Sequence, residues 1–350
     1  MRAVLKLHNK AEVAFELEEE IGIEGKNSRV FRARDPQLEA RIVIKQVPKN
    51  AIAHIDEYFA ESSRLYISAH PNVVPIHYAC QDTDHVYLAM PYFAKGSLKG
   101  LLATRALTVR EIVTLGTQFL SGLHHIHSKG LIHFDVKPDN VLISNRGEAL
   151  LSDFGLAKPV SLEGVAGQDR LYGKMTPPEA FDTDQFTTRF DIYQVGLTIF
   201  RMCVGDAEFY RQYESFIENG TLRRDDFRFA VRNLRFPDTG TYPPHIPQVL
   251  RNTVRHCLRT DPSERLPSAL AAVNELSNIE GAMLDWQYEE SATGRTWIKI
   301  TDDRTYSLAV ATNGESIALR RPSSGKQTKI REFCQKDIPA KEIQRFLREH

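Results

Sequence analysis

Short runs in which apolar and polar residues alternate dominate the first ninety residues and predict a small sheet. The predicted strands are AFELEEEIG, RVFRARD, ARIVIKQV and HVYLAMPYF. At residues 54–69 the apolar positions instead recur every three to four residues, which predicts one helix within this sheet. From residue 97 to 278 the helical period prevails, and residues 109–130 are its clearest example, with Gly130 as the expected end. We therefore expect a strand-rich lobe, about 15–93, followed by a helical lobe, about 97–278.

The pattern changes again after residue 280. The runs RTWIKITDD, TYSLAVAT, ESIALRRP and QTKIREF predict strands, and the dipeptide Asn313–Gly314 is typical of a hairpin turn. Residues 338–350 predict a terminal helix with an apolar face, and Asp337 is placed to cap it. We expect a separate small α+β domain over residues 281–350, besides an N-terminal extension over residues 1–14.

The overall composition does not indicate a charged partner. The 350 residues contain 45 basic and 45 acidic side chains, so no global field favours nucleic acid or a membrane surface. The most apolar run, residues 192–205, is shorter than the ~20 residues that span a bilayer, and the N-terminal residues lack the continuous apolar core of a signal peptide. The four cysteines are scattered, without a CxxC pair. We expect a cytoplasmic protein that contacts no membrane.

The C-terminal residues are locally basic. From residue 320 onward there are nine basic and four acidic side chains, and nine minus four gives +5. Such an excess, with Phe333 and Phe346 nearby, predicts contact with an acidic protein or with nucleic acid. The alternative is a solvated charged face on a small docking domain.

Four residues with side chains suited to catalysis, His133, Asp135, Lys137 and Asn140, lie in one short loop, and the tripeptide DFG begins eighteen residues after Asp135, at Asp153. The loop HFDVKPDN and this tripeptide resemble the HRDxKxxN catalytic loop and the DFG motif of the eukaryotic-type (Hanks-type) protein kinases. The resemblance implies that Asp135 accepts the proton of an attacking hydroxyl, while Lys137 neutralises charge on the γ-phosphate of ATP. It implies Asn140 and Asp153 as oxygen ligands of Mg²⁺.

Other motifs of the same family occur in the family's order. The run IVIK ends at Lys45, the implied ligand of the α- and β-phosphates, and Glu61 is placed as its ion-pair partner. Downstream, Arg265 is placed to pair with Glu179 of the PPE motif, and Asp191 stands for the helix F aspartate. The implied site comprises the catalytic residues Asp135, Lys137, Lys45 and Glu61, the ATP-binding residues Gly22, Gly25, Val30, Lys45, Met90, Tyr92 and Leu142, and the metal ligands Asn140 and Asp153.

This resemblance covers about residues 15–278 and implies an α+β fold. The expected architecture is a bilobal protein kinase-like domain over residues 15–280, with a β-rich first lobe, a helical second lobe and the small C-terminal domain appended. The glycine-rich loop departs from the family pattern, because Gly22 lies one residue too far from Val30 and Ser28 takes the place of the third glycine.

The most consequential departure is Phe134, which stands where the family has an arginine. In most members that arginine binds a phosphate on the activation segment, and a cation is needed because the phosphate carries about two negative charges. Phe134 cannot do this. We therefore expect activity that needs no phosphate on Ser161, Tyr172 or Thr176, the hydroxyl-bearing residues between Asp153 and Glu179. Tyr172 also replaces the threonine that the family places near the catalytic loop.

The predicted function is an ATP- and Mg²⁺-dependent serine/threonine protein kinase. Lys137 resembles the serine/threonine branch, so the expected substrate is a protein with a Ser or Thr acceptor, and the C-terminal domain is expected to regulate or target the kinase. Two alternatives remain open. One is a pseudokinase scaffold that binds nucleotide without transferring phosphate, and the other is a phosphotransferase that acts on a small molecule or on nucleic acid.

Overall fold

A computed structural model describes residues 13–22, 28–52, 69–168 and 173–350. The chain forms two compact units, one of residues up to His70 together with Val74–Ala94, and the other of Pro71–Val73 together with Lys95–His350. No helix in the described ranges is both long enough and apolar enough to cross a membrane.

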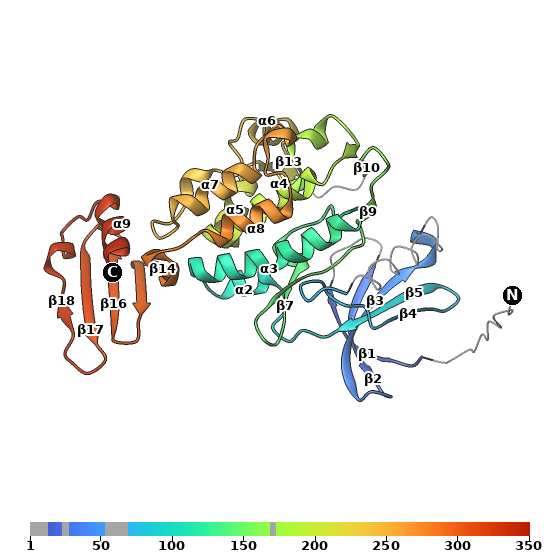
Figure 1. Cartoon of the computed structure of the whole chain (residues 1–350), viewed down its shortest axis with the longest axis horizontal. Helices are drawn as coiled ribbons and strands as arrows, with labels where there is room; N and C mark the ends of the chain where they lie inside the picture. Colours follow the sequence, from blue (N-terminus) through green and yellow to red (C-terminus); the bar gives the residue numbers. More distant parts are fainter. Residues whose placement is uncertain (1–12, 23–27, 53–68, 169–172) are drawn as a thin grey trace, which may run out of the picture. The chain divides into compact units, whose positions relative to one another are not determined.

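The first unit contains a five-stranded antiparallel sheet in the order β1-β2-β3-β5-β4 (Figure 1). Its strands are β1 (Glu16–Gly22), β2 (Arg29–Asp35), β3 (Ala40–Pro48), β4 (Tyr78–Gln81) and β5 (His85–Pro91). One face packs Ala33, Ile42, Ile44 and Ala89 into a small core, as the alternating pattern predicts. The four expected strands are confirmed, whereas β4 was not foreseen. Residues 54–68 of the expected helix lie outside the described residues.

The second unit contains a series of helices before its C-terminal sheet. They are α2 (Leu98–Thr104), α3 (Val109–Ser128), α4 (Arg189–Val204), α5 (Asp206–Glu214), α6 (Arg224–Arg232), α7 (Gln248–Cys257) and α8 (Ala269–Ser277). Thr108 and Glu111 form a capping box at the start of α3, and Gly130, at φ +70°, follows its end as expected. The apolar run predicted as a buried helix is α4, and Gly196 lets it approach α7 closely.

Four short strand pairs hold the segments between these helices. β6 (Leu131–Ile132) pairs with β9 (Lys158–Pro159), and β7 (Val141–Ile143) pairs with β8 (Ala149–Leu151). β10 (Ala166–Gly167) pairs with β11 (Gln185–Phe186), and β12 (Ile217–Glu218) pairs with β13 (Thr221–Leu222). The first two pairs hold the residues on both sides of the predicted catalytic loop and of the DFG motif.

The end of the chain forms a second antiparallel sheet in the order β14-β15-β16-β17-β18. Its strands are β14 (Gln287–Ser291), β15 (Gly294–Ile300), β16 (Arg304–Ala311), β17 (Ser316–Pro322) and β18 (Thr328–Lys329). Figure 1 shows α9 (Ala340–Glu349) lying against this sheet. Trp286, Trp297, Leu308, Phe333 and Phe346 form the centre of its core, which is distinct from the core of the helices.

Two expectations for this region were wrong in detail. Asp337 does not cap α9, because the helix begins at Ala340 behind Pro339, which has no side-chain group that could cap it. The run QTKIREF is a strand only at Thr328–Lys329, and a 3₁₀ turn follows at Arg331–Phe333. The Asn313–Gly314 turn is confirmed between β16 and β17, and Gly314 has the positive φ of +88° that favours glycine.

Candidate active site

The predicted catalytic loop is tied to α4 through Asp191. Its Oδ2 accepts the N–H of His133 and its Oδ1 accepts the N–H of Phe134, both at 2.8 Å. The ring of His127 on α3 lies 2.8 Å from Asp191 Oδ2, a contact that sequence reasoning missed. Phe134 has φ +65°, a left-handed conformation that a bulky residue adopts only when its surroundings enforce it. The buried carboxylate of Asp191 therefore helps to hold a strained turn next to Asp135.

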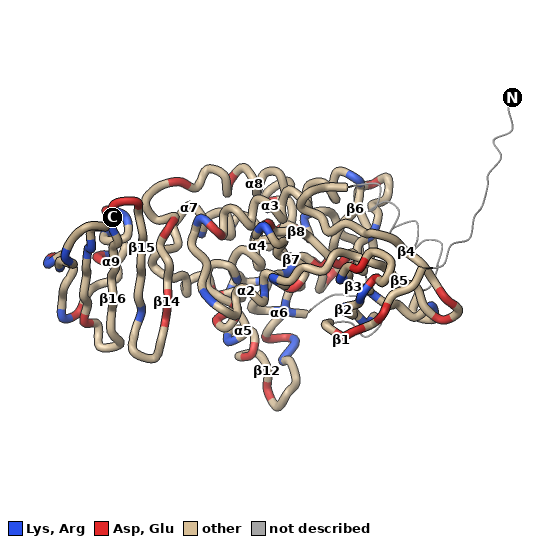
Figure 2. Tube along the Cα trace, turned by 90° about the horizontal axis from the view of Figure 1, so that it is seen from below, with Lys and Arg blue, Asp and Glu red and all other residues tan. Residues whose placement is uncertain are grey.

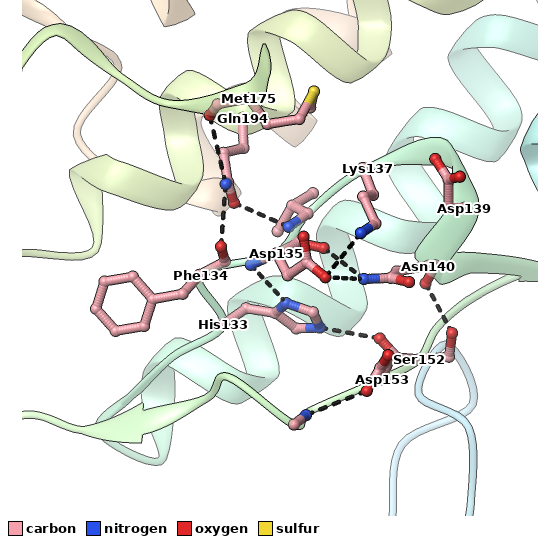
Figure 3. A network of polar contacts seen from close by, with 12 residues as sticks. His133, Phe134, Asp135, Lys137, Asp139, Asn140, Ser152, Asp153, Met175 and Gln194 are labelled. Carbon is pink, nitrogen blue, oxygen red and sulfur yellow. Dashed lines mark hydrogen bonds and ion pairs between the residues drawn. The ribbon is translucent and has the colours of Figure 1, made fainter. Parts of the chain in front are cut away.

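Asp135, Lys137 and Asn140 converge as the motif predicts (Figure 3). Lys137 Nζ lies 3.0 Å from Asp135 Oδ2, and Asn140 Nδ2 donates to the same oxygen at 2.7 Å and to the Asp135 carbonyl at 2.8 Å. All three side chains are buried. Asp135 Oδ1 is also buried, and no described group donates to it. Burial raises the pKa of the Asp135 carboxyl, while the Lys137 ammonium opposes part of that rise.

His133 is a packing residue rather than a base. Its Nε2 lies 3.1 Å from the Ser152 carbonyl, which can only accept, so Nε2 carries the proton. Its Nδ1 then accepts the N–H of Asp135 at 3.2 Å. Burial lowers the pKa of His133, so the ring stays neutral, and it meets the Phe154 ring edge-on at 4.9 Å. The imidazole thus orients the backbone of Asp135 without taking up its proton.

Asn140 and Asp153 fit the oxygen ligands that a magnesium ion requires. The side-chain hydrogen bonds of Asn140 use its amide nitrogen, which leaves the amide oxygen for a cation. Asp153 follows β8 with φ +56°, and its Oδ1 accepts the N–H of Gly155 at 3.2 Å. The described residues contain no cluster of three or more His, Cys, Asp or Glu side chains suited to a metal. Proteins usually bind Mg²⁺ through one or two side chains, completed by substrate phosphates and water.

A buried ionic group next to the loop was not predicted. Asp139 Oδ1 lies 2.6 Å from Lys99 Nζ, and its Oδ2 lies 3.6 Å from Arg201. Arg201, which is completely buried on α4, forms a bidentate pair with Asp206 at 2.7 and 2.8 Å. The signal in the sequence was a cation inside the most apolar run of the chain. A buried cation requires a partner, so Arg201 indicated an acidic group nearby.

The residues predicted to bind ATP fall on both units. In the first unit, the strand register places Gly22 opposite Val30 and Val30 opposite Lys45, so the three lie in one row across β1, β2 and β3. A Cβ at Gly22 would lie 3.1 Å from Val30 Cβ, which explains why glycine suits this position.

The remaining predicted ATP-binding residues are placed as follows. Met90 lies in β5, opposite Val43 of β3, and Tyr92 follows just after β5. In the second unit, Leu142 lies in β7 opposite Leu150. Gly25 and Glu61 are outside the described residues, and the expected Lys45–Glu61 ion pair with them.

The side chain of Phe134 points away from the polar group formed by Asp135, Lys137 and Asn140 (Figure 3). It is buried, and it meets Phe190 edge-on at 5.0 Å and Phe186 at 5.9 Å, while those two rings are 4.9 Å apart. These three rings, which we call the aromatic cluster, pack with Ile132 and Ala166 in one small core. Leu156, Val160 and Ala180 pack against this core. The place of the missing arginine is therefore occupied by apolar contacts between the loop, the segment after DFG and the start of α4.

The predicted ion pair between Glu179 and Arg265 is confirmed. The two side chains form a bidentate pair with distances of 2.7 and 2.5 Å, and Arg265 is buried. Arg265 also donates to the carbonyls of Arg259 and Arg189, so one guanidinium joins the PPE motif to two further segments.

The buried carboxylate of Asp135, the DFG motif and the strand-rich and helical units together are the features of a protein kinase domain. The sequence profile of the family described as protein kinase domain matches residues 15–276, and the chain belongs to this family. The predicted membership of the Hanks-type serine/threonine kinases, with a β-rich lobe and a helical lobe, is thereby confirmed. A C-terminal sheet follows the matched region.

Three relatives illustrate the similarity. The serine/threonine-protein kinase PknD of Protochlamydia amoebophila is 26% identical over 301 residues, 75% of this chain and 29% of the relative. The 3-phosphoinositide-dependent protein kinase 1 of Arabidopsis thaliana is 26% identical over 256 residues, covering 69% of this chain and 49% of the relative. The serine/threonine-protein kinase PrkC of Bacillus subtilis is 26% identical over 254 residues, covering 70% and 37%. The chain thus spans half or less of the length of these relatives.

Proposed function

We propose that this chain is an ATP- and Mg²⁺-dependent serine/threonine protein kinase that works without a phosphate on its activation segment. The observation that carries the proposal is the carboxylate of Asp135. One of its oxygens is bound by Lys137 and Asn140, while the other is buried without a described donor. Buried acceptors in folded proteins are almost always paired, so this oxygen is suited to receive a donor from a substrate. The hydroxyl of a Ser or Thr residue is such a donor.

Each residue of the site then has a defined part. Asp135 accepts the proton of the attacking hydroxyl, and Lys137 balances the charge of the transferred phosphoryl group. Lys45 would contact the α- and β-phosphates of ATP, and Gly22 and Val30, which lie in the same row of the sheet, would pack against the nucleotide. Asn140 and Asp153 would hold Mg²⁺, which would neutralise charge on the phosphates of ATP.

The aromatic cluster around Phe134 supports independence from phosphorylation. In place of a cation that needs a phosphate partner, Phe134 packs against Phe186 and Phe190. β10 pairs with β11 beside this cluster, so the segment after DFG is held by apolar contacts and backbone hydrogen bonds. Thr176, one of the hydroxyl-bearing residues of the segment, is buried and so poorly accessible to another kinase.

We further propose that residues 15–280 form the kinase domain and that residues 281–350 form a domain that regulates or targets it. The contacts of this C-terminal domain with the helical lobe support a regulatory role. Arg110 pairs with Asp285 at 2.5 Å, and Gln287 Nε2 donates to the Ala106 carbonyl at 3.0 Å. Because Arg110 and Ala106 lie at or just before α3, a change in this contact can reach the helix that precedes the catalytic loop.

The C-terminal sheet also offers a basic surface for a partner. Residues 317–331 contain five basic and no acidic side chains, all of them exposed, and Figure 2 shows Lys and Arg positions along this sheet. Exposed neighbours such as Ile300 and Ile317 are aliphatic, whereas single-stranded nucleic acid is bound by stacking on aromatic rings. An acidic protein is therefore the partner we favour. To distinguish an acidic protein from nucleic acid, binding of poly-glutamate and of RNA is measured for the full chain and for the double variant Arg320→Glu/Arg321→Glu.

One assay tests the proposed activity. The full chain is incubated with radiolabelled ATP, Mg²⁺ and general protein substrates, beside Asp135→Ala and the surface control Asp302→Ala. We expect label on protein for the wild type and the control, and a rate lower by roughly 10²–10⁴-fold for Asp135→Ala. No label from the wild type supports the nucleotide-binding scaffold instead. Label confined to a small molecule or to nucleic acid supports the other phosphotransferase.

A further inference from the structure

One face of α4 is turned towards the backbone of the catalytic loop. Asp191, Gln194 and Thr198 lie three and four residues apart, so their side chains share this face. Asp191 binds two backbone N–H groups of the loop, and Thr198 Oγ1 donates to the Val136 carbonyl at 3.3 Å. Gln194 lies between the two and is buried, with 1% of its surface exposed.

The carboxamide of Gln194 makes three contacts. Its Oε1 accepts the N–H of Val136 at 2.8 Å, and its Nε2 donates to the carbonyl of Phe134 at 3.0 Å and to that of Met175 at 3.5 Å (Figure 3). Phe134 and Val136 are the two neighbours of Asp135. Met175 lies in the last turn of the activation segment, four residues before Glu179. One amide thus binds both sides of the catalytic aspartate and the segment that leads to the PPE motif.

These contacts require an amide. A carboxamide carries one strong acceptor and two N–H donors in a fixed plane, which matches one N–H and two carbonyl groups. A methionine of similar length would leave these buried backbone groups unpaired. A glutamate would still accept the N–H of Val136, but its second oxygen would face two carbonyl oxygens. Gln194 is therefore specified by its hydrogen bonds and not only by its volume.

We infer that Gln194 is a positioning residue that fixes Asp135 relative to the activation segment, and hence relative to the hydroxyl of the protein substrate. The inference rests on the proposed kinase function. Phe134 brings no charged group that could link the loop to the activation segment, and the Gln194 amide supplies a polar link at that place. Misplacement of a reacting group by about 1 Å costs on the order of 10²-fold in rate, so the effect should appear in turnover.

The test compares Gln194→Met with Gln212→Met in the full chain. Gln212 is also buried and also binds a backbone N–H and carbonyl, both of Asp238, but it lies on α5 away from the loop. For Gln194→Met we expect kcat on a protein substrate to fall roughly 10-fold to 10²-fold, with KM for ATP unchanged. For Gln212→Met we expect wild-type kcat. Equal losses in both variants, or full kcat in Gln194→Met, would overturn the inference.

A double-mutant cycle with Asp135→Asn separates positioning from general damage. If Gln194 acts through Asp135, adding Gln194→Met to Asp135→Asn lowers kcat no further, whereas multiplied losses contradict the inference. Gln194→Glu serves if the methionine variant does not fold. Its turnover relative to wild type should rise as the pH falls, because a protonated carboxyl regains one donor, and a constant ratio contradicts the inference. A wild type that transfers no phosphate defeats the proposed function itself.

Discussion

The ring of Phe134 meets that of Phe190 edge-on at 5.0 Å, at the position where a cation was expected from the sequence motif. Because this cluster is buried, replacing Phe134 by arginine would place an unpaired charge among apolar side chains. We expect Phe134→Arg to lower the free energy of unfolding by about 3–5 kcal/mol. Phe134→Leu, which keeps the site apolar, should cost about 1–2 kcal/mol. Urea unfolding of both variants measures the difference, and equal stability of Phe134→Arg and wild type would contradict it.

From the same packing we expect kinase activity that does not depend on the hydroxyl groups of the activation segment. We expect the triple variant Ser161→Ala, Tyr172→Phe, Thr176→Ala to keep the initial rate of the wild type, because Phe134 stands where an arginine would bind a phosphate on this segment. Treatment of the wild type with a phosphatase should likewise leave its rate unchanged. The rates are compared at matched protein concentration, with circular dichroism to verify folding. A triple variant that is folded but inactive would show that a phosphate is needed.

The sequence predicted those parts of the site that lie close together along the chain. Asp135, Lys137 and Asn140 are within six residues, and a short loop brings them together in the structure. The distant pair of Glu179 and Arg265 was also predicted, because family motifs fixed both positions. The contacts of Gln194 and of Arg201 were not, since they depend on how α4 packs against a loop about sixty residues earlier. Asp337 was misassigned because a capping residue is defined by the first turn of the helix, which begins later than the apolar pattern indicates.

Burial of Asp135 predicts the acid side of the pH profile. Its pKa is raised above the ordinary 3.8, chiefly by burial, so the carboxyl takes up its proton at a higher pH than a free aspartate. Since the protonated form cannot accept the hydroxyl proton, kcat should fall as the pH drops through this raised pKa. The folded state binds this proton more tightly than the unfolded state, so protonation of Asp135 does not itself favour unfolding.

A pH series of initial rates, with circular dichroism recorded on the same samples to follow the helices, tests this expectation for Asp135. The residual rate of Asp135→Asn should lack the acid limb, because the amide does not titrate in this range. An identical acid limb in Asp135→Asn would assign it to another group. A loss of helical circular dichroism that coincides with the loss of rate would assign it to unfolding.

A buried histidine, His245, lies at the contact between the C-terminal sheet and the helical lobe, and burial keeps its ring neutral. Trp297 Nε1 donates to His245 Nδ1 at 3.2 Å, and the His245 ring lies 4.9 Å from that of Tyr288. Burial lowers the pKa of His245 to about 3, and the nearby Arg251 adds to this effect. Protonation would abolish the acceptor for Trp297. Because the unfolded chain takes up this proton first, the stabilisation is complete above pH 6.5 and is lost progressively as the pH falls towards 3.

We therefore expect the C-terminal sheet of the wild type to lose stability below pH 6.5, by up to about 1.4 kcal/mol for each pH unit, relative to His245→Phe. The phenylalanine keeps the ring contact with Tyr288 but does not titrate. Both tryptophans of the chain, Trp286 and Trp297, lie in this region, so their fluorescence during urea unfolding reports on it, while circular dichroism follows the helices. His77→Phe, at an exposed position of the first unit, controls for the loss of a histidine. The carboxylates are the same in wild type and His245→Phe, so their titration cancels in the difference between the two free energies of unfolding. If that difference does not change with pH, His245 is not the group that destabilises the sheet in acid.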